Sequence, residues 1–351
     1  MSKFKNILKH SRILTKSYVV LPRIAKDYFD LLVLKKKVLR KVDIAIIAGC
    51  NAKCKFCFAT TLENDQSPQL SLEEVKSIIT QSIKLGAFTF EFIGGEPLMC
   101  HHLCDAIRFA KKSRSLVAVT TNGVLLTKKK VLELKEAGLD VVQISLDSAD
   151  HKEHDESRGI KGCYEKIMQA IPWIRESGIE LMLSTVATNQ NLENDGLMKV
   201  IKFAEQLNVP ITVNPASKSG EWRGKENILL TEKNKEAFHK IVRTSHARWA
   251  GQVNFLGDGC PCGKEIIYIT AFGHVIPCAF IQISYGNIRN ESLEQIWDRL
   301  QAHKLVSERK KTCIAALDKN FIDQYINPLD RVENLPVFIH DHPTYKNRIG
   351  V

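Results

Sequence analysis

Six apolar segments that alternate with amphipathic stretches place the strongest limit on how this chain can fold. Such segments predict buried strands, and the stretches between them predict helices that return the chain to the same end of a sheet. Ser71 and Glu74 form an S-x-x-E capping box, and Gly86, Gly138 and Gly178 lie where helices should end. The sequence therefore predicts an α/β fold built on a partial parallel (β/α)6 barrel, with strands expected at residues 42–48, 88–93, 116–121, 141–146, 181–188 and 209–214.

The composition and the cysteine content are typical of a globular protein in a reducing compartment. Of the 351 residues, 44% are hydrophobic and 25% are charged, and no segment reaches the length of a membrane span. Ten cysteines in a chain without a signal-peptide pattern indicate reduced thiols or metal ligands rather than disulfides. We therefore expect a cytoplasmic protein with a sizeable core.

The positive charge is concentrated at the N-terminus. Residues 1–41 hold twelve Lys or Arg against Asp27 and Asp30, a net charge of +10 out of +11 for the whole chain. Their apolar residues recur at near-helical spacing that Pro22 interrupts, which predicts two amphipathic helices, the second beginning at that proline. Such helices either attach to an anionic membrane surface or an acidic partner, or cover the core with their lysines outward.

Cys50, Cys54 and Cys57 form a C-x-x-x-C-x-x-C motif directly after the first expected strand. A four-iron cluster normally takes four cysteines, so three in one loop indicate a distant fourth ligand or an iron left open to a small molecule. A structural zinc site is the alternative, but zinc would need a fourth nearby Cys or His, and none follows before Cys100. The motif therefore favours an iron–sulfur active site.

This loop resembles the signature of radical S-adenosylmethionine (AdoMet) enzymes, with Phe56 at the position of the family's aromatic residue. The sequence Gly94-Gly95-Glu96-Pro97, at the end of the second strand, is similar to the family's second motif, which grips the AdoMet amino group. By the same resemblance, polar residues that end the third and fourth strands face the ribose and methionine of AdoMet; these are Thr121, Asn122, Ser145 and Asp147. Each of them could equally serve turn chemistry.

Residues 154–159, His-Asp-x-x-Arg-Gly, are similar to a segment common in the SPASM/twitch subgroup of that family. There the arginine, here Arg158, pairs with the AdoMet carboxylate, a contact for which a guanidinium is well suited. The alternative is a surface ion pair between Arg158 and Asp155 or Glu156. Asn189, at the end of the fifth strand, is a further candidate for contact with adenine or ribose.

A second cysteine group resembles the opening of the iron–sulfur SPASM domain; its members are Cys260, Cys262, Cys278 and Cys313. A complete SPASM domain continues with a dense cysteine series and holds two auxiliary clusters, whereas the shortened twitch form holds one. The resemblance thus implies one auxiliary [4Fe–4S] cluster on four thiolates or, without Cys313, a cluster with one iron open to substrate. Four thiolates would also satisfy a zinc knuckle.

These patterns divide the chain into five expected parts. They are a basic helical segment (1–41), a radical SAM core (42–215), a linker and helix (216–250), a twitch- or SPASM-like domain (251–320) and a C-terminal tail without clear periodicity (321–351). We see no separate leader-peptide-binding domain before the barrel, which disfavours the maturation of ribosomal peptides.

The resemblance implies that AdoMet is reductively cleaved to methionine and a 5′-deoxyadenosyl radical, which abstracts hydrogen from a substrate for oxidation, cross-linking or rearrangement. Family members act on peptides, protein side chains, sugars or cofactor precursors, and the basic N-terminus adds a lipid-linked substrate to these classes. No residue is identified as a general acid or base, and the electron donor would be a protein such as flavodoxin or ferredoxin. The competing hypothesis is a non-enzymatic zinc- or nucleic-acid-binding protein, whereas the enzyme hypothesis expects no nucleic acid.

Overall fold

The computed structural model describes residues 20–62, 65–252, 259–303 and 311–346. Of the two helices expected near the N-terminus, the second is present as α3 (Leu21–Leu32), with a proline in its first turn as predicted. The first lies outside the described residues. In the described part of the chain, no helix is both long enough and apolar enough to span a membrane.

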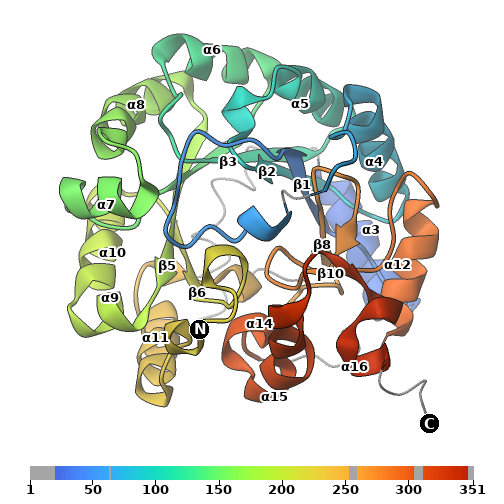
Figure 1. The fold of residues 1–351 in the computed structure, drawn as a ribbon. Helices are drawn as coiled ribbons and strands as arrows, with labels where there is room; N and C mark the ends of the chain where they lie inside the picture. The colour runs from blue at the N-terminus through green and yellow to red at the C-terminus, as the bar shows by residue number, and fades with distance from the viewer. Residues whose placement is uncertain (1–19, 63–64, 253–258, 304–310, 347–351) are drawn as a thin grey trace.

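Six parallel strands form the centre of the molecule, and each lies within two residues of its predicted position. They are β1 (Lys41–Ile47), β2 (Thr89–Gly94), β3 (Leu116–Thr121), β4 (Val141–Ser145), β5 (Glu180–Ala187) and β6 (Ile211–Pro215). Each pairs in parallel with the next, and the sheet curves into a partial barrel with its helices on the outside (Figure 1). The α/β fold class predicted from the sequence is confirmed.

Helices connect the carboxyl end of each strand to the amino end of the next. They are α4 (Leu72–Lys84), α5 (Leu103–Lys112), α6 (Lys128–Ala137), α7 (His151–Arg158), α8 (Cys163–Ser177), α9 (Asn189–Glu193) and α10 (Gly196–Gln206). The capping box of Ser71 and Glu74 opens α4, and Gly138 and Gly178 end α6 and α8 in the left-handed conformation. These local signals acted as predicted, since each satisfies backbone groups that a helix end leaves unpaired.

The two faces of the sheet differ in polarity. Every second residue of β1 packs between the sheet and the helices in the main hydrophobic core; these residues are Val42, Ile44 and Ile46. The face that lines the barrel interior is polar, and its side chains are linked from strand to strand: Lys41 to Glu91, Thr120 to Glu91, and Gln143 to Thr120. The interior of the barrel therefore presents charged and hydrogen-bonding groups.

The change of pattern after residue 215 does not end the sheet. A short strand, β7 (Ala247–Arg248), pairs with β6, and β8 (Ile266–Ile269) pairs in parallel with β1, followed by the antiparallel β9 (Val275–Ile276). The helix expected within residues 216–250 is α11 (Glu232–Thr244), which ends before β7 begins. The C-terminal part of the chain thus extends the barrel sheet at both of its edges.

The C-terminal part adds one longer helix and several short elements. These are β10 (Ile283–Ser284), α12 (Leu293–Ala302), α14 (Ile314–Leu317), α15 (Lys319–Phe321), a π-helix (Ile322–Ile326), a 3-10 helix (Asn327–Arg331), β11 (Val337–Phe338) and α16 (Pro343–Lys346). β11 pairs with β10, and the buried His342 shares a hydrogen bond of 3.0 Å with the backbone oxygen of Tyr325. The tail packs against the rest of the protein although its sequence lacks periodicity.

Candidate functional site

The cysteine loop, residues 50–57, follows β1 and crosses the carboxyl ends of the barrel strands (Figure 1). Cys50 is exposed, while Cys54 and Cys57 are half-buried. The last carbonyls of α7 hold the loop, because Lys53 N donates to Arg158 O and Lys55 N donates to Ser157 O, both at 3.1 Å. Helix-end carbonyls need such partners, so one contact satisfies the helix and positions the cysteines.

Gly95 packs directly against the backbone that leads into the cysteine loop. Its N–H donates to Ile47 O at 2.8 Å, and the next N–H, that of Glu96, donates to Gly49 O at 2.9 Å. A Cβ at Gly95 would lie 2.1 Å from Gly49 O and 2.3 Å from Ala48 O, so no other residue fits here. The Gly-Gly pair therefore serves the close approach of two protein segments in addition to its predicted role at AdoMet.

The Glu96 carboxylate ties this motif to the end of β3. It is buried, with Oε1 accepting from Thr121 Oγ1 at 2.6 Å and from Leu98 N at 3.1 Å, and Oε2 accepting from Asn122 N at 2.9 Å. Burial raises the pKa of Glu96, and these donors oppose the increase. The carboxylate thus braces the loops after β2 and β3, and Pro97 beside it is also buried.

Asn122 continues the bracing into the cysteine loop. Its side-chain Nδ2 donates to Asn51 Oδ1 at 2.7 Å, and its Oδ1 accepts from Val124 N at 3.0 Å. Ser145, at the end of β4, lies opposite Ser184 of β5. The structure thus brings Thr121, Asn122 and the cysteine loop into one contiguous network at the carboxyl ends of the strands.

Arg158 forms a buried ion pair with Asp147, with 2.6 Å between Nε and Oδ2. Neither alternative partner is used, since Glu156 pairs with Lys55 and Asp155 accepts from the backbone at the start of α8. Burial opposes the charge of Arg158, but the carboxylate of Asp147 and the thiol of Cys54 raise its pKa above the usual value. The guanidinium also lies 3.7 Å from Cys54 Sγ, so it faces the cysteine loop.

His154 supports this pair from behind. It is fully buried, and its Nδ1 accepts from Asp147 N at 3.2 Å. Burial lowers the pKa of His154 to about 4, with Asp147 opposing the decrease, so the imidazole is neutral near pH 7. A neutral ring next to Arg158 avoids repulsion between two cations.

Asn189 does not reach this network. Its Nδ2 donates to Leu229 O at 2.9 Å, and its Oδ1 accepts from Thr231 N and Asn234 Nδ2. Its amide holds the segment that leads into α11, so the sequence-based expectation of contact with adenine or ribose finds no support.

The loop of residues 216–224 covers the cysteine loop, and no motif in the sequence identified it. Glu221 N donates to Cys57 O at 2.9 Å, and a Cβ at Gly220 would lie 1.9 Å from that oxygen. The ring centroids of Trp222 and Phe56 are 5.5 Å apart. The Arg158 guanidinium also lies over the Phe56 ring, 5.2 Å from its centroid. A polar, Gly-containing stretch gives no local signal for such a long-range contact.

Lys218 fixes the 216–224 loop to the C-terminal tail. Its side chain is fully buried, and its ammonium contacts Glu226, Asn327 Oδ1 at 2.7 Å and Asp330 Oδ2 at 3.0 Å. Burial lowers the pKa of Lys218, but its acceptors raise it above the usual value, so the ammonium keeps its charge. The tail therefore supports the cover of the cysteine loop.

The second cysteine group comes together beyond the barrel. The Cys262 thiol hydrogen-bonds with both Cys260 and Cys278, which lowers the pKa of Cys260 to about 7 and raises the pKa of Cys262. Cys313, at the start of α14, is buried near Cys260 and Cys278, and burial raises its pKa. Among the described residues, no set of three His, Cys, Asp or Glu is placed to hold a single metal ion.

Two family models match this chain: the Radical SAM superfamily over residues 44–203, and the iron–sulfur cluster-binding SPASM domain over residues 260–315. An AdoMet-dependent heme synthase of Methanosarcina barkeri (strain Fusaro / DSM 804) is 24% identical over 288 residues, which cover 74% of this chain and 82% of that protein. A PqqA peptide cyclase of Rhizobium meliloti (strain 1021) is 25% identical over 268 residues, covering 71% of this chain and 70% of the cyclase. This chain is a radical SAM enzyme of the SPASM subgroup.

Solved structures share the fold of this radical SAM enzyme. Streptococcus suis SuiB bound to precursor peptide SuiA superposes with a TM-score of 0.63 at 18% identity, over 90% of this chain and 78% of that one. The structure of anSMEcpe with bound AdoMet gives a TM-score of 0.60 at 18% identity, over 76% and 84%. At such identities the likeness concerns the fold, and it agrees with the partial barrel described above.

Membership in the family confirms the expected cofactors, [4Fe–4S] clusters and AdoMet. The residues at the barrel mouth fit them in two respects. All ten cysteines lie in the described part of the chain and none is in a disulfide, so three thiols of the cysteine loop are available as ligands. The Asp147 carboxylate oxygens are buried without a hydrogen-bond donor, apart from the ion pair with Arg158, and this suits a ligand that brings donors.

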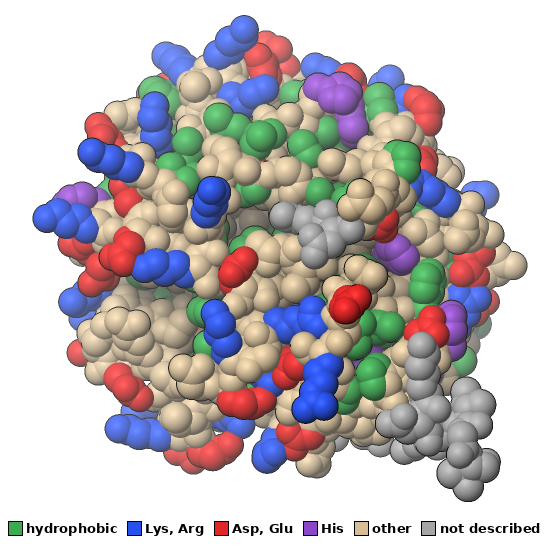
Figure 2. All heavy atoms as spheres, viewed as in Figure 1, with side chains coloured by type: hydrophobic (Ala, Val, Ile, Leu, Met, Phe, Trp, Pro, Cys, Tyr) green, Lys and Arg blue, Asp and Glu red, His purple; other side chains and the backbone are tan. Residues whose placement is uncertain are grey.

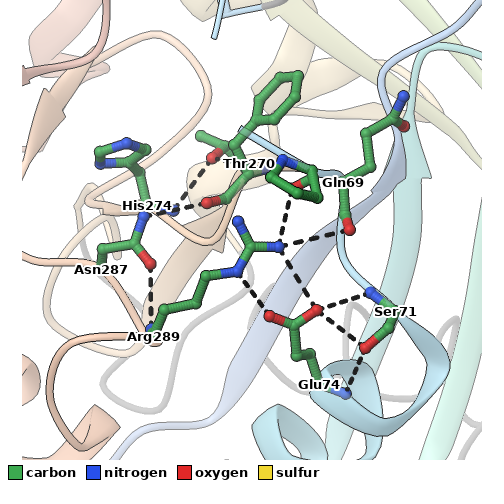
Figure 3. A network of polar contacts seen from close by, with 9 residues as sticks. Gln69, Ser71, Glu74, Thr270, His274, Asn287 and Arg289 are labelled. Carbon is green, nitrogen blue, oxygen red and sulfur yellow. Dashed lines mark hydrogen bonds and ion pairs between the residues drawn. The ribbon is translucent and has the colours of Figure 1, made fainter. Parts of the chain in front are cut away.

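A separate polar network joins the SPASM region to the barrel (Figure 3). Arg289 Nε donates to Glu74 Oε1 at 2.6 Å, and Arg289 Nη2 donates to Pro68 O at 2.8 Å. The Arg289 side chain and the N-terminal backbone of α4 lower the pKa of Glu74 to about 2. The capping box predicted from the sequence therefore also anchors the second cysteine group's domain to the barrel.

Proposed function

We propose that Cys50, Cys54 and Cys57 hold the [4Fe–4S] cluster at which AdoMet binds, and that the second cysteine group holds an auxiliary [4Fe–4S] cluster. The observation that carries the first assignment is the fixing of the cysteine loop by three segments from different parts of the chain. These are the Gly94–Gly95 turn, the end of α7 and the 216–224 loop. Such rigid support is what a site for a demanding ligand requires.

The residues around the loop divide into two roles. Asp147 and Arg158 offer a carboxylate and a guanidinium beside the cysteines, so we assign them to the charged groups of AdoMet, with Ser145 near them at the end of β4. Glu96, Thr121 and Asn122 hydrogen-bond one another, and we assign them to positioning the Gly-Gly turn and the cysteine loop. When bound, the reduced cluster and AdoMet supply a 5′-deoxyadenosyl radical that abstracts hydrogen from substrate.

The 216–224 loop keeps water from this site. Trp222 packs on Phe56, and Lys218 locks the loop to the tail. Exclusion of water protects a reactive intermediate from side reactions. We expect the electron to come from a protein such as flavodoxin or ferredoxin.

The barrel interior favours a polar substrate. Lys41, Asp43, Glu91 and Arg248 all face it, and burial raises the pKa of Asp43 to about 6 and lowers that of Arg248 to about 10. Arg248 has a buried Nε without a hydrogen-bond partner, and its Nη2 donates to the sulfur of Met182 at 3.6 Å. The Glu91 carboxylate attracts its charge without forming a hydrogen bond with this Nε. A group of this kind suits a substrate carboxylate.

Among substrates with carboxylates, we favour a peptide, although the sequence alone disfavoured the maturation of ribosomal peptides. A PqqA peptide cyclase is among the relatives, and SuiB with its precursor peptide shares the fold over most of this chain. A heme synthase is also among the relatives, so the test of the substrate class compares peptides with tetrapyrroles. We propose oxidation or cross-linking of a peptide whose acidic group is held by Arg248.

Iron content tests the cofactor assignment. Anaerobically reconstituted wild type should hold about eight irons, and both Cys50→Ala/Cys54→Ala/Cys57→Ala and Cys260→Ala/Cys262→Ala/Cys278→Ala/Cys313→Ala should hold about four. Only the first variant should lose the release of methionine from AdoMet under dithionite. Zinc in place of iron at the second cysteine group of the wild type would overturn the assignment of the auxiliary cluster. Methionine release by the first variant would overturn the assignment of the cysteine loop.

Formation of 5′-deoxyadenosine tests the substrate class. Acidic peptides should raise it above the substrate-free rate, whereas tetrapyrroles should not. Arg248→Gln should abolish the increase without changing the substrate-free rate, with Leu132→Ser on the outer face of α6 as the control. Stimulation by a tetrapyrrole alone would contradict the peptide proposal while leaving the cofactor assignment intact.

A further inference from the structure

Helix α3 turns its apolar side away from the protein. Its inward face carries the buried Asp27 and Asp30, whereas large apolar residues on the helix and just after it are exposed. These residues, named here the α3 apolar face, are Leu21 (48% exposed), Phe29 (53%), Leu32 (50%), Val33 (60%) and Leu34 (47%). A helix on the surface of a globular protein normally does the opposite and buries its apolar stripe.

Contacts on the inward side fix this orientation. Arg23 Nη2 donates to Ser113 O at 2.7 Å, and its Nη1 donates to Ser115 Oγ at 3.4 Å. Ile24 and Leu31 pack against a small apolar cluster. Rotation of the helix would break these contacts, so the outward position of the α3 apolar face belongs to the fold.

Basic residues surround the apolar face. Lys26 is exposed beside it, and residues 35–37 are three exposed lysines that follow it directly. Two of these lysines form ion pairs with Asp30. Lys26 contacts its carboxylate, and Lys36 Nζ lies 3.8 Å from Asp30 Oδ1. Over residues 1–37 the sequence holds ten Lys or Arg and two Asp, so the acidic groups neutralise little of the charge.

We propose that the α3 apolar face docks onto the surface of an anionic phospholipid bilayer. Helices that lie in a membrane interface combine two kinds of contact. Their apolar side chains enter the boundary of the acyl chains, and their lysines bind the lipid phosphates. A second copy of this chain is disfavoured as the occupant, because it would bring two segments of the same strong positive charge together. This inference does not depend on the proposed function.

Docking by α3 would turn the active site away from the bilayer. Ser113, Ser115 and Phe88 lie just before β3 and β2, so α3 packs at the amino ends of the strands, opposite the cysteine loop. Figure 1 shows α3 in the background, behind α4 and α12. On the face toward the viewer, acidic and basic side chains are interspersed (Figure 2). Membrane contact would therefore localise the enzyme and leave the barrel mouth open to a water-borne substrate.

Vesicle sedimentation of the full chain tests the proposal. The probes are vesicles of phosphatidylcholine alone and of phosphatidylcholine with phosphatidylglycerol in a three-to-one ratio. Wild type should bind the anionic vesicles about tenfold more tightly, and high salt should weaken this binding. Phe29→Ser/Leu32→Ser should weaken it by about tenfold or more, whereas Leu132→Ser, which changes an exposed leucine of α6 (56% exposed), should bind as wild type does.

A second variant keeps the test independent of folding. Lys35→Gln/Lys36→Gln/Lys37→Gln leaves the apolar face intact and should reduce both the binding to anionic vesicles and its salt dependence. Unchanged iron content would show that each variant is folded. Equal binding of wild type to both vesicle types would overturn the proposal, as would wild-type binding by Phe29→Ser/Leu32→Ser or a dimer in solution that this variant converts to monomer.

Discussion

The closest contact between the two proposed AdoMet motifs makes Gly95 the most informative position to change. In Gly95→Ala, the added Cβ would start 2.1 Å from Gly49 O and 2.3 Å from Ala48 O, whereas real Cβ atoms almost never come closer than 3.0 Å. The two segments must therefore separate by about 1 Å. Both neighbours are backbone oxygens, so no side chain can rotate to make room.

The cost of this separation follows from the contacts that it breaks. Overpacking costs about 1–3 kcal/mol, and the hydrogen bonds from Gly95 N to Ile47 O and from Glu96 N to Gly49 O lengthen, at about 1 kcal/mol each. We expect a loss of about 4 kcal/mol in unfolding free energy and a decrease of roughly 5 °C in the melting temperature. Because the shift is transmitted to the segment before Cys50, reconstitution with iron should also fail in part.

Gly49→Ala is the matched control. Gly49 lies on the other side of the same contact, but a Cβ there meets no atom within 4 Å, and its backbone is not in the left-handed region. Thermal unfolding of the cluster-free proteins compares the steric effects alone, and iron content after anaerobic reconstitution then reports on the cysteine loop. Equal melting temperatures for Gly95→Ala and Gly49→Ala would refute the reasoning.

Three further predictions concern the neighbouring ionisable groups. Arg158→Lys should weaken AdoMet binding by at least about tenfold in equilibrium dialysis, because an ammonium cannot match the geometry of a guanidinium, whereas Glu156→Gln, which removes an exposed ion pair, should leave binding unchanged. Burial lowers the pKa of His154 from 6.5 to about 4, so the unfolded chain takes up the proton at a higher pH than the folded protein does. The unfolding free energy should therefore fall by up to about 1.4 kcal/mol per pH unit as the pH decreases from 6.5 to 4. His154→Gln should flatten this decline in urea titrations, and an equally steep decline in wild type and variant would contradict the assignment. Lys218→Met should cost about 3 kcal/mol, the low end for breaking a buried ion pair, because the partners Asp330 and Glu226 are partly exposed. It should also raise the accessibility of Trp222 to a fluorescence quencher, and unchanged quenching would show that the 216–224 loop does not depend on the tail.

Much of the barrel could be predicted because its signals are local. Strand positions follow from short apolar runs, and helix ends follow from the capping box at Ser71 and the glycines at 138 and 178. These signals depend on hydrogen bonds and packing among residues a few positions apart, so an isolated stretch of sequence already contains them. The spacing of Cys50, Cys54 and Cys57 is local in the same sense, and it indicated an iron–sulfur site without any knowledge of the surroundings.

The partners of those residues were decided only by tertiary structure. The sequence offered Asp155 and Glu156 as surface partners of Arg158, yet the guanidinium pairs with Asp147, because α7 packs so that its last turn faces the end of β4. The pairing of β8 with β1 and the cover provided by the 216–224 loop likewise join segments far apart in the chain. Periodicity carries no information about such contacts.

Helix α3 shows the same division most clearly. The sequence by itself indicated an amphipathic helix that begins at Pro22, within the basic segment of residues 1–41. It could not determine which side faces the core, because the apolar stripe alone predicts burial. The structure instead buries Asp27 and Asp30, since Arg23 finds acceptors at the start of β3 and only a small apolar cluster is available there. A helical pattern fixes the two faces of a helix, but the surface it meets decides which one is turned to the solvent.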